Sequence, residues 1–272
     1  MDMHYIRRGT GHPLILIHGL GSTWRSWIAI LSALAAERAV IAVDLPGFGD
    51  SPPLPEEPSI AALADSITDL MATHGFTGAD LVGSSMGARL VLELARRGAT
   101  GTVIALDPGG FWSPWQLRYF EITLKLSIRL VRALQPVMPE LTKHAIGRTL
   151  LLSQLSARPW NLPHGLALDE MRSYAASPSF DGALNQLIYG PAQEGADSTP
   201  GQIIIGWGRK DRVCFPSQAT RALQLFPRAR LHWFEDCGHF PQWDVPEAAA
   251  RLILSSATHS KPLDHADLTK NR

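Results

Sequence analysis

The sequence contains few cysteines: only Cys214 and Cys237 occur among 272 residues. A disulfide framework needs more cysteines than this, and the spacing matches no zinc site. Cysteine is often buried as a free thiol, so we expect both side chains to lie reduced in the core. Such cysteine usage favours a reducing compartment, and we expect a cytoplasmic protein.

Net charge and long apolar runs are also missing. The 25 Lys and Arg residues balance 25 Asp and Glu residues, so nothing suggests general attraction to nucleic acid. Gly and Pro interrupt residues 101–115, and no apolar stretch reaches the roughly 20 residues of a membrane helix. The N-terminal "MDMHYIRRGTGHP" lacks the apolar centre of a signal peptide. We therefore expect no nucleic-acid partner and no stable membrane insertion, and the oligomeric state stays open.

Short apolar runs alternate with helical patterns along most of the chain. The runs are nearly continuous in Ile, Val and Leu, as in parallel strands buried on both faces. They occupy residues 13–19, 39–46, 79–85, 102–109, 202–208 and 229–237. Helical spacing is found at 26–37, 59–73, 86–97, 216–225 and 246–257. This alternation predicts an α/β fold with a mainly parallel, twisted sheet of about seven or eight strands and helices on both faces.

The alternation stops between residues 112 and 200, which are helical with proline-rich breaks. We interpret this stretch as a helical insertion above a core formed by residues 1–111 and 201–257, and we expect the polar tail 258–272 to be disordered. The expected helix 115–134 carries four cations, for which a solvated face is the simpler interpretation and contact with a membrane or partner the alternative. They are Arg118, Lys125, Arg129 and Arg132.

The segment "LVGSSMG" (81–87) places a serine between glycines where a strand gives way to a helix. In the pattern Gly83-x-Ser85-x-Gly87, a tight turn holds the central hydroxyl clear of the backbone, and side chains at the glycines would collide with neighbouring elements. We predict that Ser85 is a nucleophile and that the adjacent Ser84 packs or hydrogen-bonds beside the turn.

A serine needs a base, and the base needs an orienting acid. His239 follows the last expected strand, and Asp211 follows the strand at 202–208. The chain order Ser85, Asp211, His239 is the order of the triad that accompanies this serine turn. Asp107, also at a strand end, is the rival acid, for which we favour a turn role because Pro108 follows it.

Two backbone amides are expected to stabilise negative charge on a substrate oxygen. One is the amide of Met86, directly after the nucleophile. The other is the amide of Leu20 in the loop "HGLGSTW" (18–24), whose glycines allow a close approach. We assign His18 of this loop a loop-fixing hydrogen bond rather than a role as base.

The motifs "HGLG", "DLPGFGDS", "GSSMG", "WGRKD" and "CGH" occur in that order, and together they resemble the α/β-hydrolase superfamily, in the subgroup with a helical cap. The resemblance covers residues 4–257, with 112–200 matching only as a cap of suitable size. It implies that Asp44 and Ser51 are scaffold. It also implies catalysis without metal or organic cofactor. A serine nucleophile argues against the relatives that use a carboxylate there.

We therefore expect a serine hydrolase that cleaves a carboxylic ester or related acyl compound. The predicted pocket residues are Trp112, Trp115, Phe240 and Trp243, which favour a small, hydrophobic acyl or aromatic substrate. Two alternatives stay open. The segment "CGHFPQWDVPE" (237–247) is similar to that of serine hydrolases that cleave carbon–carbon bonds in aromatic ring-fission products, and some members of the fold bind ligands without catalysis. Lactonase, thioesterase and perhydrolase activities also fit these residues.

Overall fold

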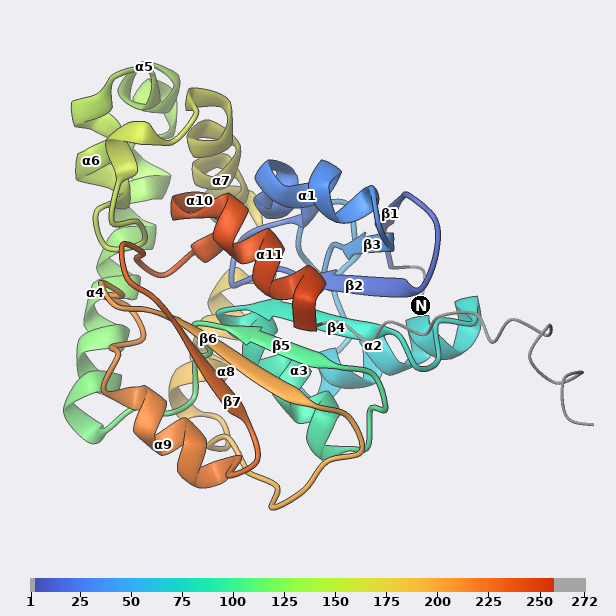
Figure 1. The fold of residues 1–272 in the computed structure, drawn as a ribbon. Coiled ribbons are helices and arrows are strands. Elements are labelled where there is room, and N and C mark those ends of the chain that lie inside the picture. Colours follow the sequence, from blue (N-terminus) through green and yellow to red (C-terminus); the bar gives the residue numbers. More distant parts are fainter. Residues whose placement is uncertain (1–2, 257–272) are drawn as a thin grey trace, which may run out of the picture.

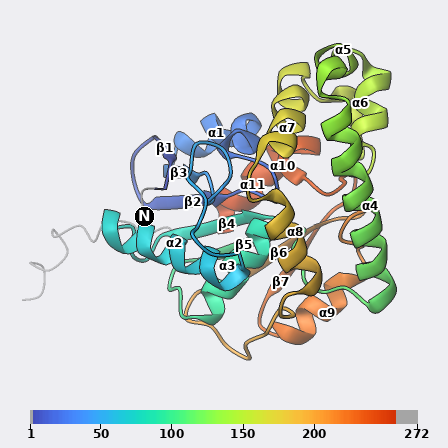
Figure 2. The same cartoon turned by 180° about the vertical axis from the view of Figure 1, so that it is seen from behind.

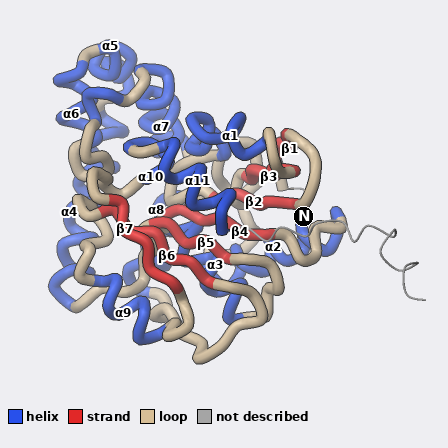
Figure 3. The backbone as a smooth tube through the Cα atoms, in the orientation of Figure 1, coloured by secondary structure: helices blue, strands red, loops and turns tan. Residues whose placement is uncertain are grey.

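The computed structural model describes residues 3–256 and contains a seven-stranded sheet in the order β1-β3-β2-β4-β5-β6-β7 (Figures 1 and 3). All neighbouring strands are parallel except β1, which runs antiparallel to β3. The predicted α/β fold class is thereby confirmed. The strands are β1 (Tyr5–Arg8), β2 (Pro13–Ile17), β3 (Ala39–Val43), β4 (Asp80–Ser84), β5 (Val103–Leu106), β6 (Ile203–Gly208) and β7 (Arg230–Phe234).

Each of the six apolar runs in the sequence contains one of the strands β2 to β7, whereas β1 has no counterpart among them. Its sequence, YIRR, ends in two exposed arginines because β1 is an edge strand with one neighbour. A short edge strand carrying charges shows no continuous apolar run, which is why the sequence pattern did not reveal it.

Helices cover both faces of the sheet. One apolar layer contains α1 and α11, and the other contains α2, α3 and α9. The expected start and end of α2 are confirmed: the Ser59 hydroxyl accepts a hydrogen bond from the Ala62 amide at 3.1 Å, and Gly75 takes the left-handed conformation at φ 70°. The core helices are η1 (Trp24–Trp27), α1 (Ile28–Ala35), α2 (Ile60–His74), α3 (Met86–Arg96), α9 (Gln218–Leu225), α10 (Pro241–Asp244) and α11 (Pro246–Ser256).

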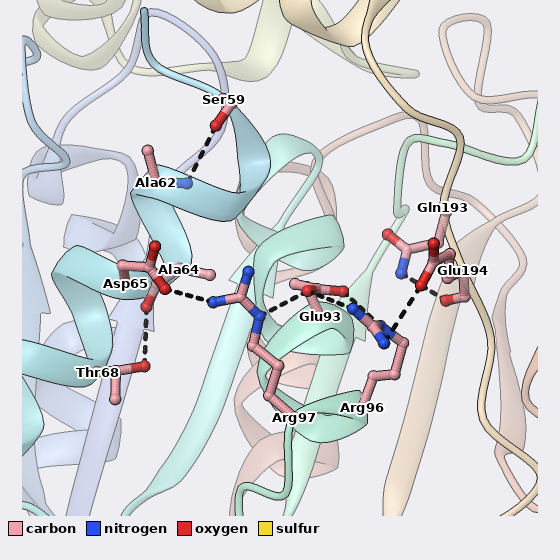
Figure 4. A network of polar contacts seen from close by, with 10 residues as sticks. All are labelled: Ser59, Ala62, Ala64, Asp65, Thr68, Glu93, Arg96, Arg97, Gln193 and Glu194. Atoms are coloured by element: carbon pink, nitrogen blue, oxygen red, sulfur yellow. Dashed lines mark hydrogen bonds and ion pairs between the residues drawn. The ribbon is translucent and has the colours of Figure 1, made fainter. Parts of the chain in front are cut away.

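An ionic cluster at the end of α3 links this helix to its surroundings (Figure 4). Glu93 accepts hydrogen bonds from Arg96 at 2.8 Å and from Arg97 at 2.6 Å. Arg97 also reaches Asp65 of α2, and Arg96 reaches Glu194 in the connection to β6. Burial alone would raise the pKa of the Glu93 carboxyl. The hydrogen bonds and charges of Arg96 and Arg97 together outweigh this effect, so the pKa of Glu93 is lowered. The cluster fixes α3, whose first residue follows Ser85.

Five α-helices and two 3-10 helices lie between β5 and β6, and we call residues 112–200 the insertion. Figures 1 and 2 show that α4, α6 and α7 lie beside one end of the strands of the sheet. The elements are α4 (Pro114–Ala133), η2 (Gln135–Val137), α5 (Met138–Lys143), α6 (Ala145–Leu152), η3 (Pro159–Asn161), α7 (His164–Ala176) and α8 (Phe180–Tyr189).

Three further expectations concern the whole chain. Cys214 and Cys237 are free and buried, as predicted. Within residues 3–256, no helix combines the length and apolar character needed to cross a membrane. The predicted tail at 258–272 lies outside the described residues.

Candidate active site

Ser85 occupies a strained turn between β4 and α3. Its backbone has φ 57° and ψ −114°, and its amide donates to the Leu106 carbonyl at 2.9 Å. A Cβ on Gly83 would lie 2.1 Å from the Gly87 carbonyl oxygen, and one on Gly87 would lie 2.2 Å from the Ile17 carbonyl oxygen. The expectation that side chains at both glycines would collide with neighbouring elements is therefore confirmed, and strain of this kind is typical of functional turns.

The structure brings Ser85, His239 and Asp211 into one hydrogen-bonded chain. His239 Nε2 lies 2.8 Å from Ser85 Oγ, and His239 Nδ1 lies 2.8 Å from Asp211 Oδ2. Because the carboxylate only accepts, Nδ1 carries the proton and Nε2 is free to accept from the serine hydroxyl. This is the tautomer required of a base that removes the serine proton.

The Asp211 carboxylate is fixed by its own loop. Its Oδ1 accepts from the amides of Val213 at 2.7 Å and Cys214 at 3.0 Å, which leaves Oδ2 for His239. The rival acid Asp107 instead accepts from the Gly208 amide at 2.8 Å and has a φ of 48°, in keeping with the predicted turn role. Burial and the neighbouring charge of Asp211 raise the pKa of Asp107 well above its usual range, which favours the neutral carboxyl.

Asp244 is a positioning residue that sequence reasoning missed. Its Oδ2 accepts from the amides of Gly238 and Ala157, both at 2.7 Å, and its Oδ1 accepts from the Ser156 hydroxyl. The His239 amide donates to the Leu155 carbonyl at 2.9 Å. The insertion is thus fastened to the loop that carries His239. The sequence shows an acid five residues after the histidine. It does not show that this acid binds Ser156 and Ala157, which lie 88 and 87 residues away.

The loop after β2 lies directly against Ser85. A Cβ on Gly19 would lie 3.1 Å from the Ser85 Cβ, so glycine permits this approach. His18 Nε2 accepts from the Leu45 amide at 2.9 Å, and Nδ1 donates to the Gly19 carbonyl at 2.7 Å. Burial lowers the pKa of His18, which favours the neutral ring that these two bonds require. The loop-fixing role predicted for His18 is confirmed.

Met86 and Leu20, whose amides are predicted as oxyanion donors, both belong to the surroundings of Ser85. Met86 is the first residue of α3, where amides have no partner within the helix, and Leu20 shares a cavity wall with Ser85. Within residues 3–256, neither amide donates a hydrogen bond to another protein group. Both amides are therefore free to donate to a substrate oxygen.

Helix α7 holds the same loop from the insertion side. The Ser173 hydroxyl donates to the Gly21 carbonyl at 2.6 Å, and the Ser22 hydroxyl donates to Glu170 at 2.9 Å. A Cβ on Gly21 would lie 2.7 Å from the Tyr174 ring, which shows how closely this ring covers the loop. Burial raises the pKa of Glu170 to about 8, which keeps the carboxyl largely protonated at neutral pH.

Ser85 and His239 lie on the wall of a cavity of about 230 Å³. The wall is mainly apolar and is built largely by the insertion. Polar side chains are few: besides Ser85 and His239, they are Ser127, Ser153, Gln154 and Tyr174. The apolar lining consists of Leu20, Phe120, Leu124, Ile128, Val131, Leu150, Leu151, Leu155, Met171, Phe180, Leu187, Val213 and Phe240.

Of the four predicted pocket aromatics, only Phe240 is part of this wall. Trp115 is 62% exposed on the outside of α4, where sequence spacing alone could not orient it. Trp112 packs behind the wall on Phe120, with ring centroids 4.7 Å apart, and Trp243 packs behind Phe240 at 4.1 Å. The pocket prediction therefore needs correction: these three tryptophans are not lining residues.

Buried polar contacts account for other residues near Ser85. Gln242 donates to the Ser84 hydroxyl at 3.1 Å, so Ser84 has the supporting role expected of it. Asp44 accepts from the Trp24 amide at 2.8 Å, and Ser51 donates to the Asp44 carbonyl at 2.6 Å. Asp44 and Ser51 are therefore scaffold, as the resemblance implied.

Two groups of potential metal ligands occur within residues 3–256: Asp211 with Cys214 and His239, and His4 with Asp44 and Asp50. In the first, hydrogen bonds already occupy the acid and the imidazole. Burial also raises the pKa of the Cys214 thiol well above its usual range, so it is a poor ligand. In the second, Asp44 Oδ2 already binds His4 at 2.7 Å and the Asp50 amide at 3.1 Å. Hydrogen bonding explains both groups.

The chain belongs to the alpha/beta hydrolase family, whose model matches residues 14–252. It is 27% identical to a 2-hydroxy-6-oxononadienedioate/2-hydroxy-6-oxononatrienedioate hydrolase of Dechloromonas aromatica, over 95% of this chain and 91% of that protein. It resembles the structure of a thermophilic esterase from Thermogutta terrifontis, with a TM-score of 0.74, 22% identity and 93% and 92% of the two chains covered. An enol-lactonase from Burkholderia xenovorans gives a TM-score of 0.74 at 20% identity, covering 93% and 95%. The family match supports a hydrolase, and the likeness to the two solved structures supports the fold.

Proposed function

We propose that this protein is a serine hydrolase that cleaves a carboxylic ester or related acyl compound. The observation that carries the proposal is the hydrogen-bonded chain from Ser85 through His239 to Asp211, which ends in an apolar cavity. We also propose that residues 112–200 are the cap of this enzyme, because they supply most of the cavity wall.

In the proposed reaction, His239 Nε2 removes the hydroxyl proton as Ser85 Oγ attacks the substrate carbonyl. The amides of Leu20 and Met86 stabilise the negative oxygen of the tetrahedral intermediate. His239 then gives the proton to the leaving alcohol, and an acyl group remains on Ser85. Water, activated by the same imidazole, attacks this acyl group and releases the acid. Asp211 stabilises the imidazolium in both halves and keeps its ring oriented.

Cleavage of a carbon–carbon bond in a ring-fission product is the second candidate. The sequence similarity to the Dechloromonas aromatica enzyme favours this candidate, because the name of that enzyme gives a hydroxy-oxo-dioate, a compound with two carboxylates, as its substrate. The cavity favours the ester. Among the described residues that line it there is no Lys or Arg, so the carboxylates of a dioate would lose water without gaining a cation. The Gln and Trp after the histidine, Gln242 and Trp243, bind scaffold atoms at Ser84 and Ser26 and discriminate neither reaction.

Labelling with a fluorophosphonate probe tests the nucleophile. We expect an adduct on the peptide containing Ser85 and none on the Ser85→Ala variant. Ser84→Ala is the matched control, because it removes the neighbouring hydroxyl, and it should still be labelled. Absence of an adduct on the folded natural protein would contradict the proposal and favour a ligand-binding member of the fold.

Substrate comparison then separates the two reactions. We expect p-nitrophenyl butyrate to be hydrolysed with a higher kcat/KM than a ring-fission dienoate. A preference for the dienoate, with labelling of Ser85 retained, would overturn the ester assignment and leave the nucleophile in place.

A further inference from the structure

The insertion exposes several large apolar side chains on α4 and α6. On α4 they recur at helical spacing along one side, opposite the side that lines the cavity. On α6, Ile146 and Leu150 are exposed by 77% and 78%. We call this set the apolar ridge; it consists of Trp115, Ile122, Leu126, Leu130, Ile146 and Leu150.

The ridge adjoins the entrance to the cavity. Leu150 lines the cavity and is also largely exposed, so the cavity reaches the surface there. Helices α4 and α6 both contribute to the cavity wall, and Gln154, just beyond α6, donates to Thr123 of α4 at 2.9 Å. Figures 1 and 2 show α4 and α6 at the same end of the molecule. Leu150 is therefore the point at which the ridge meets the cavity wall.

Positive charge is concentrated around the ridge, although the whole chain has no net charge. Residues 112–160 contain seven Lys and Arg against two Asp and Glu. Five of these cations are ion-paired with Glu121, Glu140, Asp181 or Asp236, mostly at exposed positions where such pairs contribute little. Arg129 is exposed beside Leu126 and makes no ion pair within residues 3–256. The face therefore suits an anionic partner.

We propose that the apolar ridge and its cations dock the protein on an anionic lipid surface, with the cavity entrance facing the lipid. Aliphatic side chains with Trp and Lys or Arg at their border suit the lipid interface. A second copy of the chain fits less well, because pairing two ridges would bring two cationic segments together. The proposal concerns binding alone and does not depend on hydrolysis at Ser85.

Vesicle co-sedimentation tests this proposal on the full chain. We expect at least tenfold tighter binding to phosphatidylcholine vesicles containing about one third phosphatidylglycerol than to phosphatidylcholine alone, and weaker binding as salt increases. The Ser85→Ala protein should bind equally well. Equal affinity for both vesicles, or no binding at low salt, would overturn the proposal while leaving the proposed reaction untouched.

Matched substitutions locate the binding face. We expect Leu126→Asp, Ile146→Asp and Arg129→Glu each to weaken binding about tenfold. Ile28→Asp on α1 and Arg228→Glu before β7 alter exposed residues of the core and should bind normally. Circular dichroism checks that each variant folds. Equal losses in ridge and core variants would contradict docking through the ridge. A dimer that Leu126→Asp converts to monomers would show that a second copy covers the ridge, and would also overturn the proposal.

Discussion

The sheet and the insertion differ in how far their apolar side chains are exposed to solvent. Every residue of β3, β4, β5 and β6 is buried. By contrast, nine of the ten large apolar side chains that are exposed within residues 3–256 belong to the insertion. A core that is buried on both faces holds its strand ends rigidly. The exposed apolar surface of the insertion is where we propose that lipid binds.

The proposed chemistry divides along the same boundary. Ser85, Asp211 and His239 all follow strands of the sheet, whereas most of the cavity wall comes from the insertion. The insertion touches the reactive loops through supporting contacts, at Leu155 with the His239 amide and at Ser173 with Gly21. The comparison therefore predicts that core substitutions affect the reaction itself, and that substitutions in the insertion affect substrate binding and pH dependence.

The largest expected effect follows from Asp211→Asn. An amide facing His239 Nδ1 would favour the wrong tautomer, and we expect kcat/KM for a p-nitrophenyl ester to fall about 10³- to 10⁴-fold. Asp181→Asn on α8, which removes an exposed acid of the insertion, should change it less than about twofold. Comparable losses of kcat/KM in both variants would contradict the proposal that the core carries out the reaction and the insertion does not.

A pair of glycine substitutions compares the packing of the two regions. Gly87→Ala places a methyl group 2.2 Å from the Ile17 carbonyl oxygen, and we expect it to lower the free energy of unfolding by at least about 3 kcal/mol. Gly165→Ala in α7 meets nothing within 4 Å and should raise it by about 0.5 kcal/mol, because alanine favours helix. Urea unfolding measures both values. A stable Gly87→Ala protein would show that the serine turn can move away from β2.

Glu170 gives the insertion a pH-dependent contribution to stability. Its pKa is about 8 in the folded protein and near 4.5 when unfolded, so folding favours the protonated form. This contribution is complete below pH 4.5 and falls as pH rises to 8, by on the order of 4 kcal/mol. We expect Glu170→Gln to match the natural protein at pH 5 and to unfold at higher urea at pH 8.

An exposed glutamate of the core provides the control for this measurement. Glu235→Gln, whose side chain is 76% exposed, should follow the natural protein at both pH values. An identical pH dependence in Glu170→Gln and the natural protein would mean that the buried carboxyl does not change protonation on folding.

The smallest expected effect is that of Leu150→Ala at the cavity entrance. The side chain is largely exposed, so the free energy of unfolding should change by less than about 0.5 kcal/mol. The KM for an apolar ester should rise about fivefold, because part of the apolar wall is lost. Ile28→Ala on the core surface is the matched control and should leave KM unchanged. Steady-state kinetics distinguish the two variants.

Much of the core could be predicted from local pattern. The apolar runs locate six of the seven strands, and the glycines around Ser85 predict both the turn and its crowding. The predicted acid Asp211 and the rival Asp107 both end strands, and only the fold distinguishes them. The outward direction of Trp115 and the supporting bonds of Asp244 were also beyond the sequence, since each depends on elements far apart in the chain.

By itself, the sequence determined the order of strands and helices and the residue types at the strand ends, because backbone conformation and burial follow from periodicity and from glycine. Tertiary structure alone decided which acid reaches His239, which side chains line the cavity and which face of α4 meets solvent. Those features depend on distances between segments separated by tens to hundreds of residues, and side-chain spacing along one segment carries no information about them.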